Sequence, residues 1–187
     1  MMRLRSFIPS LGMMLLAAGQ AGAEGVLIDK SEIRFVSKQM GINVEGSFRR
    51  WKANIVSLPG DLAHSKADFD IELASIDLAS DEAENEARRP SWFDTAKFPV
   101  ARFVSTSIKD LGGGKYEVAG KLTLKGVARD AVVPIAFTKD ASGNSVAEGT
   151  FTIKRLDYRI GDADWADPDT VANEVLVRVR MVLPPVR

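Results

Sequence analysis

Most of the sequence alternates apolar and polar residues with a period of two, which is typical of strands with one buried and one wet face. In the clearest case, 174–183, apolar side chains occupy one face and arginines stand on the other. Short turns separate the segments and favour antiparallel pairing in a barrel or a sandwich. The pattern predicts strands over 33–37, 42–48, 51–58, 67–76, 100–108, 116–124, 131–138, 146–156 and 174–183.

Residues 80–89 interrupt this alternation and consist mainly of good helix formers. Ser80 can cap the first turn, the acidic residues come early and the two arginines come last, an order that suits the helix dipole. Pro90 then stops the helix. We therefore expect an all-β protein of eight or nine strands with one inserted helix.

The first 23 residues have the features of an export signal. Arg3 and Arg5 precede a short apolar run over 7–18, and small residues at 21–23 fit a cleavage site. The run is short for a membrane span. We expect cleavage of 1–23 and one mature β domain over 24–187, located in the periplasm.

Composition excludes several classes of function. Basic and acidic residues number 25 each without a basic cluster, which argues against a nucleic-acid partner. There is no cysteine and only one histidine, His64, so thiol chemistry and multi-histidine metal sites are excluded. The acidic stretch 162–169 lacks the glycine of a calcium loop and has Ala166 at a ligand position. We expect no metal and no cofactor.

Catalytic machinery is equally hard to find. The sequence has no Gly-x-Ser-x-Gly elbow, and His64 has no evident partner for nucleophilic catalysis. The glycines at 112–114 precede a strand instead of a helix, so they predict a hairpin turn and not a phosphate loop. We expect a protein that is not an enzyme; a hydrolase dependent on His64 is the weaker alternative.

The aromatic residues lie mostly on the expected strands or just after the helix. The simplest interpretation is that they fill a core. The functional alternative is that some of them line an apolar pocket, because a barrel of about eight strands either fills with side chains or holds one small ligand. Periodicity does not distinguish the two.

Several blocks of sequence carry a family resemblance, and their order is more specific than any one of them. The blocks are 44–51, 75–77, 92–106, 116–127 and 151–161, including Trp92-Phe93-Asp94 and Arg155-x-Asp157-Tyr158. On these the chain resembles the YceI-like family of exported lipocalin-like barrels associated with polyisoprenoid lipids. Gln39 stands where that family frequently has histidine, a departure that concerns the ligand's head group and not the barrel.

The resemblance implies an eight-stranded antiparallel lipocalin-like barrel around an elongated apolar tunnel. We expect the tunnel to be lined by Phe35, Phe48, Phe103 and Phe151, with Trp92 and Phe93 capping its mouth. Arg88 and Arg89 are candidates for contact with an anionic head group, although a charge pair at a helix C-terminus is an equally good interpretation.

Two functions follow as hypotheses. The first is a periplasmic binding or carrier protein for a long amphiphilic isoprenoid, such as a polyprenyl phosphate or an isoprenoid quinone. The second is a non-enzymatic accessory protein of a membrane b-type cytochrome, acting by protein contact through a filled barrel. The segment with Gly161, Trp165 and Asp167 resembles a subgroup found beside such cytochromes. Transient membrane contact and a homodimer are compatible with both.

Overall fold

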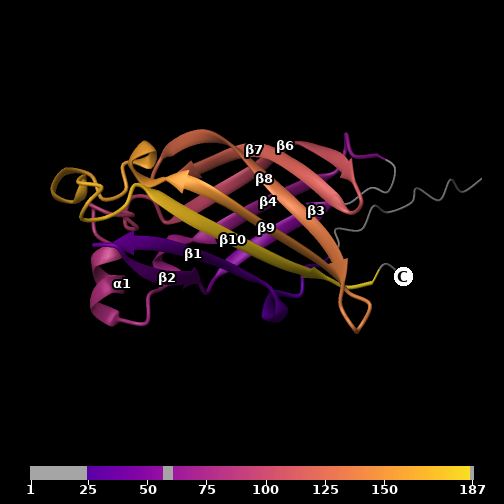
Figure 1. Ribbon diagram of the computed structural model, residues 1–187, viewed down its shortest axis with the longest axis horizontal. Coiled ribbons are helices and arrows are strands. Elements are labelled where there is room, and N and C mark those ends of the chain that lie inside the picture. Colours follow the sequence, from indigo (N-terminus) through magenta and orange to yellow (C-terminus); the bar gives the residue numbers. More distant parts are fainter. Residues whose placement is uncertain (1–24, 57–60, 186–187) are drawn as a thin grey trace, which may run out of the picture.

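The computed structural model describes residues 25–56 and 61–185, and the predicted export signal lies outside them. Ten antiparallel strands form one sheet in the order β3-β4-β6-β7-β8-β9-β10-β1-β2-β5. Figure 1 shows this sheet curling around a long axis. The strands are β1 (Glu32–Gln39), β2 (Ile42–Phe48), β3 (Trp51–Val56), β4 (Lys66–Glu72), β5 (Ile76–Asp77), β6 (Val100–Gly112), β7 (Lys115–Leu124), β8 (Val127–Lys139), β9 (Ser145–Lys154) and β10 (Glu174–Leu183).

The structure confirms the predicted all-β barrel and shows ten strands in place of eight because two strands are broken at the same corner. Arg49 and Arg50 separate β2 from β3, while the 3-10 turn η2 (Leu73–Ser75) separates β4 from β5. β2 pairs with β5 and β3 pairs with β4, so the two broken strands remain neighbours on both sides of the corner. Counted as continuous strands, they close a cycle of eight.

Ser75 holds this corner together. Its side chain is buried, and its Oγ accepts a hydrogen bond from the Arg50 backbone N–H at 3.0 Å and donates one to the Glu72 carbonyl at 2.6 Å. Its own carbonyl accepts from the Arg49 N–H at 3.0 Å, and the Glu72 N–H donates to the Arg50 carbonyl at 3.0 Å. The serine therefore replaces the ladder hydrogen bonds that the break removes.

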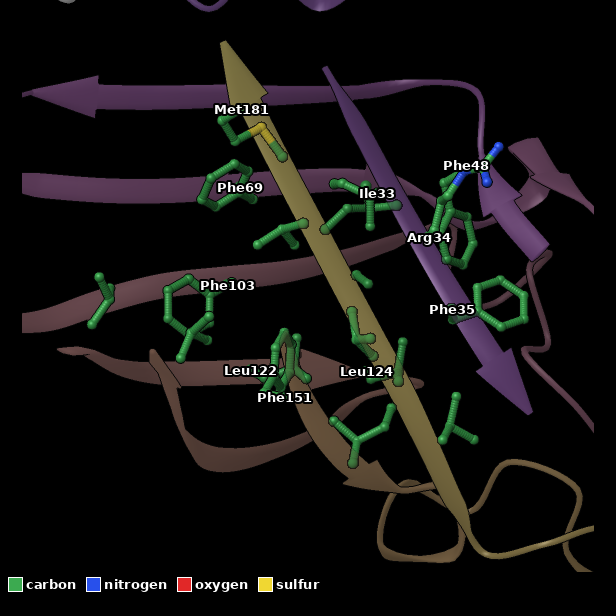
Figure 2. Close-up of a pocket in the computed structure, with 18 of the residues that line it drawn as sticks. Ile33, Arg34, Phe35, Phe48, Phe69, Phe103, Leu122, Leu124, Phe151 and Met181 are labelled. Carbon is green, nitrogen blue, oxygen red and sulfur yellow. The ribbon is translucent and has the colours of Figure 1, made fainter. Parts of the chain in front are cut away.

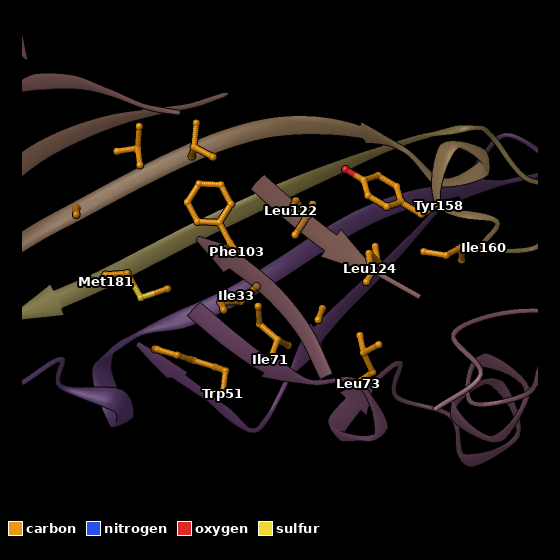
Figure 3. Packing of buried hydrophobic residues seen from close by; sticks show 14 of the residues in the cluster. Ile33, Trp51, Ile71, Leu73, Phe103, Leu122, Leu124, Tyr158, Ile160 and Met181 are labelled. Atoms are coloured by element: carbon orange, nitrogen blue, oxygen red, sulfur yellow. The ribbon is translucent and has the colours of Figure 1, made fainter. Parts of the chain in front are cut away.

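The inner face follows the predicted alternation. In β10, Val175, Val177, Val179, Met181 and Leu183 face the interior, as the sequence pattern requires. Figure 3 shows the buried side chains of β6, β7 and β10 directed toward a common space. Two predicted strands are shorter than expected: 67–76 breaks at η2, and 146–156 ends at Lys154, where the 3-10 turn η3 (Arg155–Tyr158) begins.

The predicted helix is present as α1 (Asp81–Ala87), and the Ser80 Oγ accepts from the Ala83 N–H at 3.4 Å as an N-cap. Two further 3-10 turns are η1 (Ile28–Lys30) and η4 (Ala163–Trp165). α1 and the loop between β9 and β10 lie at the same end of the barrel, away from the C-terminal end of β10 (Figure 1). We call this end, formed by 78–99 and 155–173, the helix end.

Replacing Ser75 by alanine should destabilise the protein by about 1–3 kcal/mol, because the part-buried hydrogen bond from the Arg50 N–H loses its acceptor. Urea denaturation monitored by circular dichroism measures the free energy of unfolding. The control is Ser107→Ala on the exposed face of β6, which should change stability by less than about 0.5 kcal/mol. Equal stabilities of the two variants would contradict the role assigned to Ser75.

Candidate functional site

The barrel encloses an apolar cavity of about 930 Å³, which lies at the upper end of the ~300–1,000 Å³ common for ligand sites. Side chains from every long strand contribute to its wall. Figure 2 shows Phe69, Phe103, Phe151 and Met181, from four different strands, facing the same space. The interior is therefore hollow, which periodicity alone did not decide.

All six aromatic residues predicted from the sequence line this cavity: Phe35, Phe48, Trp92, Phe93, Phe103 and Phe151. The two predicted head-group arginines do not. Arg88 donates to Glu84 Oε2 at 2.8 Å and to the Ala74 carbonyl at 3.1 Å, and the exposed Arg89 pairs with Glu86 at 3.1 Å. The structure thus places both at the helix end in ion pairs outside the lining, and their contact with a head group stays a prediction.

Two glycines on the inner face explain why large rings leave the lumen open. A Cβ at Gly46 would stand 2.3 Å from Cζ of Phe35, its partner across the β1–β2 ladder. A Cβ at Gly120 would stand 2.4 Å from Cζ of Phe103 on the neighbouring strand. Each ring therefore lies over a glycine, against the wall. The lumen keeps the volume that the rings would otherwise occupy.

At the helix end the aromatic rings form contacts across elements that are distant in sequence. Phe48 lies 5.6 Å from Phe35 and 6.1 Å from Phe93, measured between ring centroids. Trp92 lies 5.7 Å from Trp165 in η4. These contacts attach the segment after α1 to both β1–β2 and the β9–β10 loop.

Arg155 organises the loop beside these rings. It is 2% exposed and lines the cavity, and its five donor groups all reach backbone carbonyls. Nε donates to Ala172, and the two terminal nitrogens donate to Ile160, Gly161, Trp165 and Val171 at 2.6–2.9 Å. Burial lowers the pKa of Arg155 from its ordinary value, yet a guanidinium stays charged in proteins.

An ion-pair network attaches α1 to the corner at Ser75, where β2 turns into β3 and β4 into β5. Glu84 is buried on α1 and pairs with Arg88 at 2.8 Å and with Arg49 at 3.1 Å. Arg49 also pairs with Asp77 at 2.9 Å. Burial raises the pKa of Glu84, but the hydrogen bond from the Leu78 N–H and the two arginines outweigh it, so its pKa lies below the ordinary value. The helix is thereby fixed beside the cavity.

Sequence reasoning missed several lining residues. Phe69 and Met181 lie on the apolar face of strands that alternate apolar and polar residues, so this alternation could have identified them as lining residues. Arg155 and Trp165 gave no such signal, because they lie where the alternation stops and a loop folds back on the barrel. His64 is exposed and pairs with Asp61 at 2.7 Å, and it is not a lining residue.

The sequence model of the YceI-like domain matches residues 27–183. The chain belongs to the YceI-like family. A UPF0312 protein of Pseudomonas syringae pv. tomato is 32% identical over 161 residues, covering 81% of this chain and 84% of that protein. The crystal structure of Burkholderia cenocepacia BcnA is 35% identical, with a TM-score of 0.79 over 84% of this chain and 98% of that one.

A polyisoprenoid binding domain from Saccharophagus degradans, implicated in plant cell wall breakdown, shares the YceI-like fold at 18% identity. Its TM-score is 0.67, over 88% of this chain and 99% of that domain. Within the described part of this chain, no group of three acidic, histidine or cysteine side chains could hold a metal ion. None of the described helices is long and apolar enough to cross a membrane.

Gly46→Ala should lower stability by about 1–3 kcal/mol, because the added methyl group forces the Phe35 ring off the wall. Adding Phe35→Leu should restore much of this loss, since the shorter side chain leaves room for the methyl group. Gly25→Ala, where nothing lies within 4 Å of the new Cβ, should be nearly neutral. Urea denaturation of the wild type, Gly46→Ala, Phe35→Leu and the double variant measures the coupling; additive effects would contradict the proposed contact.

Acid should weaken the attachment of α1. The pKa of Glu84 is lowered in the folded protein, so its contribution is complete above the ordinary value of 4.5 and is lost as the pH falls through the folded value. Glu84→Gln should therefore flatten the loss of stability below about pH 4.5. Asp130→Asn is the comparison: Lys121 lowers the pKa of Asp130 as well, but solvent screens this exposed pair, so the slope should change less than in Glu84→Gln. Urea denaturation midpoints measured at several acidic pH values give the change of stability with pH for each protein.

Proposed function

We propose that this protein binds a long amphiphilic isoprenoid, such as a polyprenyl phosphate or an isoprenoid quinone, and carries it through the periplasm without catalysis. The observation that carries the proposal is the hollow apolar lumen of about 930 Å³. Burying a hydrocarbon chain there removes apolar surface from water, worth about 25 cal/mol per Å² before association costs. Shielding of this kind is what an insoluble lipid needs in an aqueous compartment.

Two further observations support the proposal. The Saccharophagus degradans domain with the same fold is a polyisoprenoid binding domain. Residues 1–23 have the basic, apolar and small-residue segments of an export signal, which supports the periplasm as the location.

The accessory-protein hypothesis required a barrel filled by its own side chains. The cavity favours the lipid hypothesis over it, and contact with a membrane cytochrome stays a prediction. A hydrolase dependent on His64 finds no support in the geometry, because that side chain is exposed and does not line the cavity.

The direct test is organic extraction of the protein purified from a bacterial periplasm, followed by mass spectrometry. We expect an isoprenoid lipid in amounts approaching one per protein chain. Extracts without such a lipid, together with no uptake of an added prenyl phosphate or isoprenoid quinone, would overturn the proposal.

A matched pair of variants tests whether the lumen is the binding site. Val133 lines the cavity and is 7% exposed, whereas its neighbour Val132 faces outward and is 51% exposed. Val133→Trp should place an indole in the lumen and weaken lipid binding tenfold or more, about 1.4 kcal/mol. Val132→Trp should bind like the wild type. Isothermal titration with a prenyl phosphate measures both, and equal affinities would place the ligand outside the barrel.

A further inference from the structure

We infer that the ligand enters the barrel in one orientation, with an oxygen-bearing head group at the helix end, beside Arg155 and Trp92. This inference rests on the proposed function and adds the polarity of the site. The head group would present carbonyl or phosphate oxygens, which carry partial or full negative charge. The hydrocarbon tail would then run along β6, β7 and β10 toward the opposite end.

The charge of Arg155 is the main reason. All its donors are used by backbone carbonyls, and no carboxylate among the described residues pairs with it. It therefore keeps a net positive charge while being 2% exposed in the cavity wall. A charge in such surroundings acts far more strongly than one in water, since the effective dielectric constant is about 20 instead of 80.

The other charged lining side chains do not offset this polarity. At the helix end Glu86 is neutralised by Arg89, at 3.1 Å. At the opposite end Lys66 and Asp110 are exposed to solvent, which screens their charges. Arg34 is more than half exposed and pairs with Glu32 at 3.0 Å. Arg155 is thus the one buried charge without a carboxylate partner among the described lining residues.

Trp92 provides an independent indication at the same place. It lines the cavity, and its Nε1 is buried without a hydrogen-bond partner among the described residues. A buried donor left unsatisfied costs about 1–3 kcal/mol. The Arg155 guanidinium lies 6.0 Å from the centroid of the indole ring, so an oxygen-bearing group that reached Nε1 would lie within the field of Arg155.

Three tryptophans make the orientation measurable. Trp92 and Trp165 lie together at the helix end, while Trp51 begins β3 at the corner held by Ser75. In Trp51→Phe all emission comes from the helix end. Two probes with the same isoprenoid tail are compared. The quinone probe carries a benzoquinone head group, which quenches fluorescence. The tail-labelled probe is a prenyl alcohol with a nitroxide quencher at the far end of its tail. Native mass spectrometry measures occupancy in the same samples.

At equal occupancy the quinone probe should remove most of the emission of Trp51→Phe, and the tail-labelled probe should leave most of it. Stronger quenching by the tail label, or equal quenching by both, would overturn the inference while leaving isoprenoid binding intact. Failure of both probes to bind would instead overturn the proposed function. Because Trp51 is buried, the wild type is measured in parallel and should show the same ranking if the variant does not fold.

A prenyl phosphate and the prenyl alcohol of equal length distinguish the two sources of oxygen. A preference of tenfold or more for the phosphate that persists in high salt would support an anionic head group beside buried Arg155, since salt screens buried charges little. No preference, together with quenching by the quinone head, would support a neutral carbonyl at the same place. A preference abolished by salt would assign the anion to exposed cations such as Arg89 and overturn the inference.

Discussion

The lumen depends on the closure of the sheet into a cycle of paired strands. An apolar interior of this size is protected from water only if each strand pairs with a neighbour on both sides, because an unpaired edge would expose backbone polar groups. The difficult place is the corner where β2 turns into β3 and β4 into β5. Ser75 bridges it by serving as acceptor for one broken strand and donor within the other. The Arg49–Glu84 pair then uses the same corner to position α1 at the mouth.

A closed barrel of this size does not have to be hollow, and the inner residues decide the matter. Apolar side chains of eight strands are sufficient to fill such an interior. Here the bulky rings of Phe35 and Phe103 lie over Gly46 and Gly120, so each ring covers wall instead of projecting to the axis. Glycine lowers the strand propensity of both positions, and the neighbouring ring compensates for this by covering the exposed backbone. The cavity is therefore a consequence of paired large and small residues across adjacent strands.

Local pattern predicted much of this molecule. Strand alternation correctly assigned the buried face of β10, and Ser80 with its acidic first turn correctly located α1. The alternation of apolar and polar residues could not locate the break at Ser75, because the break depends on hydrogen bonds between segments about 25 residues apart. It also could not identify Arg155, whose partners are carbonyls of a loop without periodicity. The apolar tunnel was predicted from the family resemblance, and its aromatic candidates were chosen by their positions on strands or after the helix. The environment of Arg88 and Arg89 depends on acidic partners within α1, which strand alternation does not address.

The use of an arginine to hold the β9–β10 loop has an electrostatic consequence. The loop returns over the helix end and turns several carbonyls inward, and only the guanidinium offers five donors in one rigid plane. A lysine has three donors, and an apolar side chain would leave those carbonyls unsatisfied. Folding the loop with one residue therefore brings a full positive charge into the wall of an otherwise apolar cavity. The two ends of the lumen become chemically different for a structural reason, and under the proposed function an amphiphile gains a preferred direction from the residue that holds the loop.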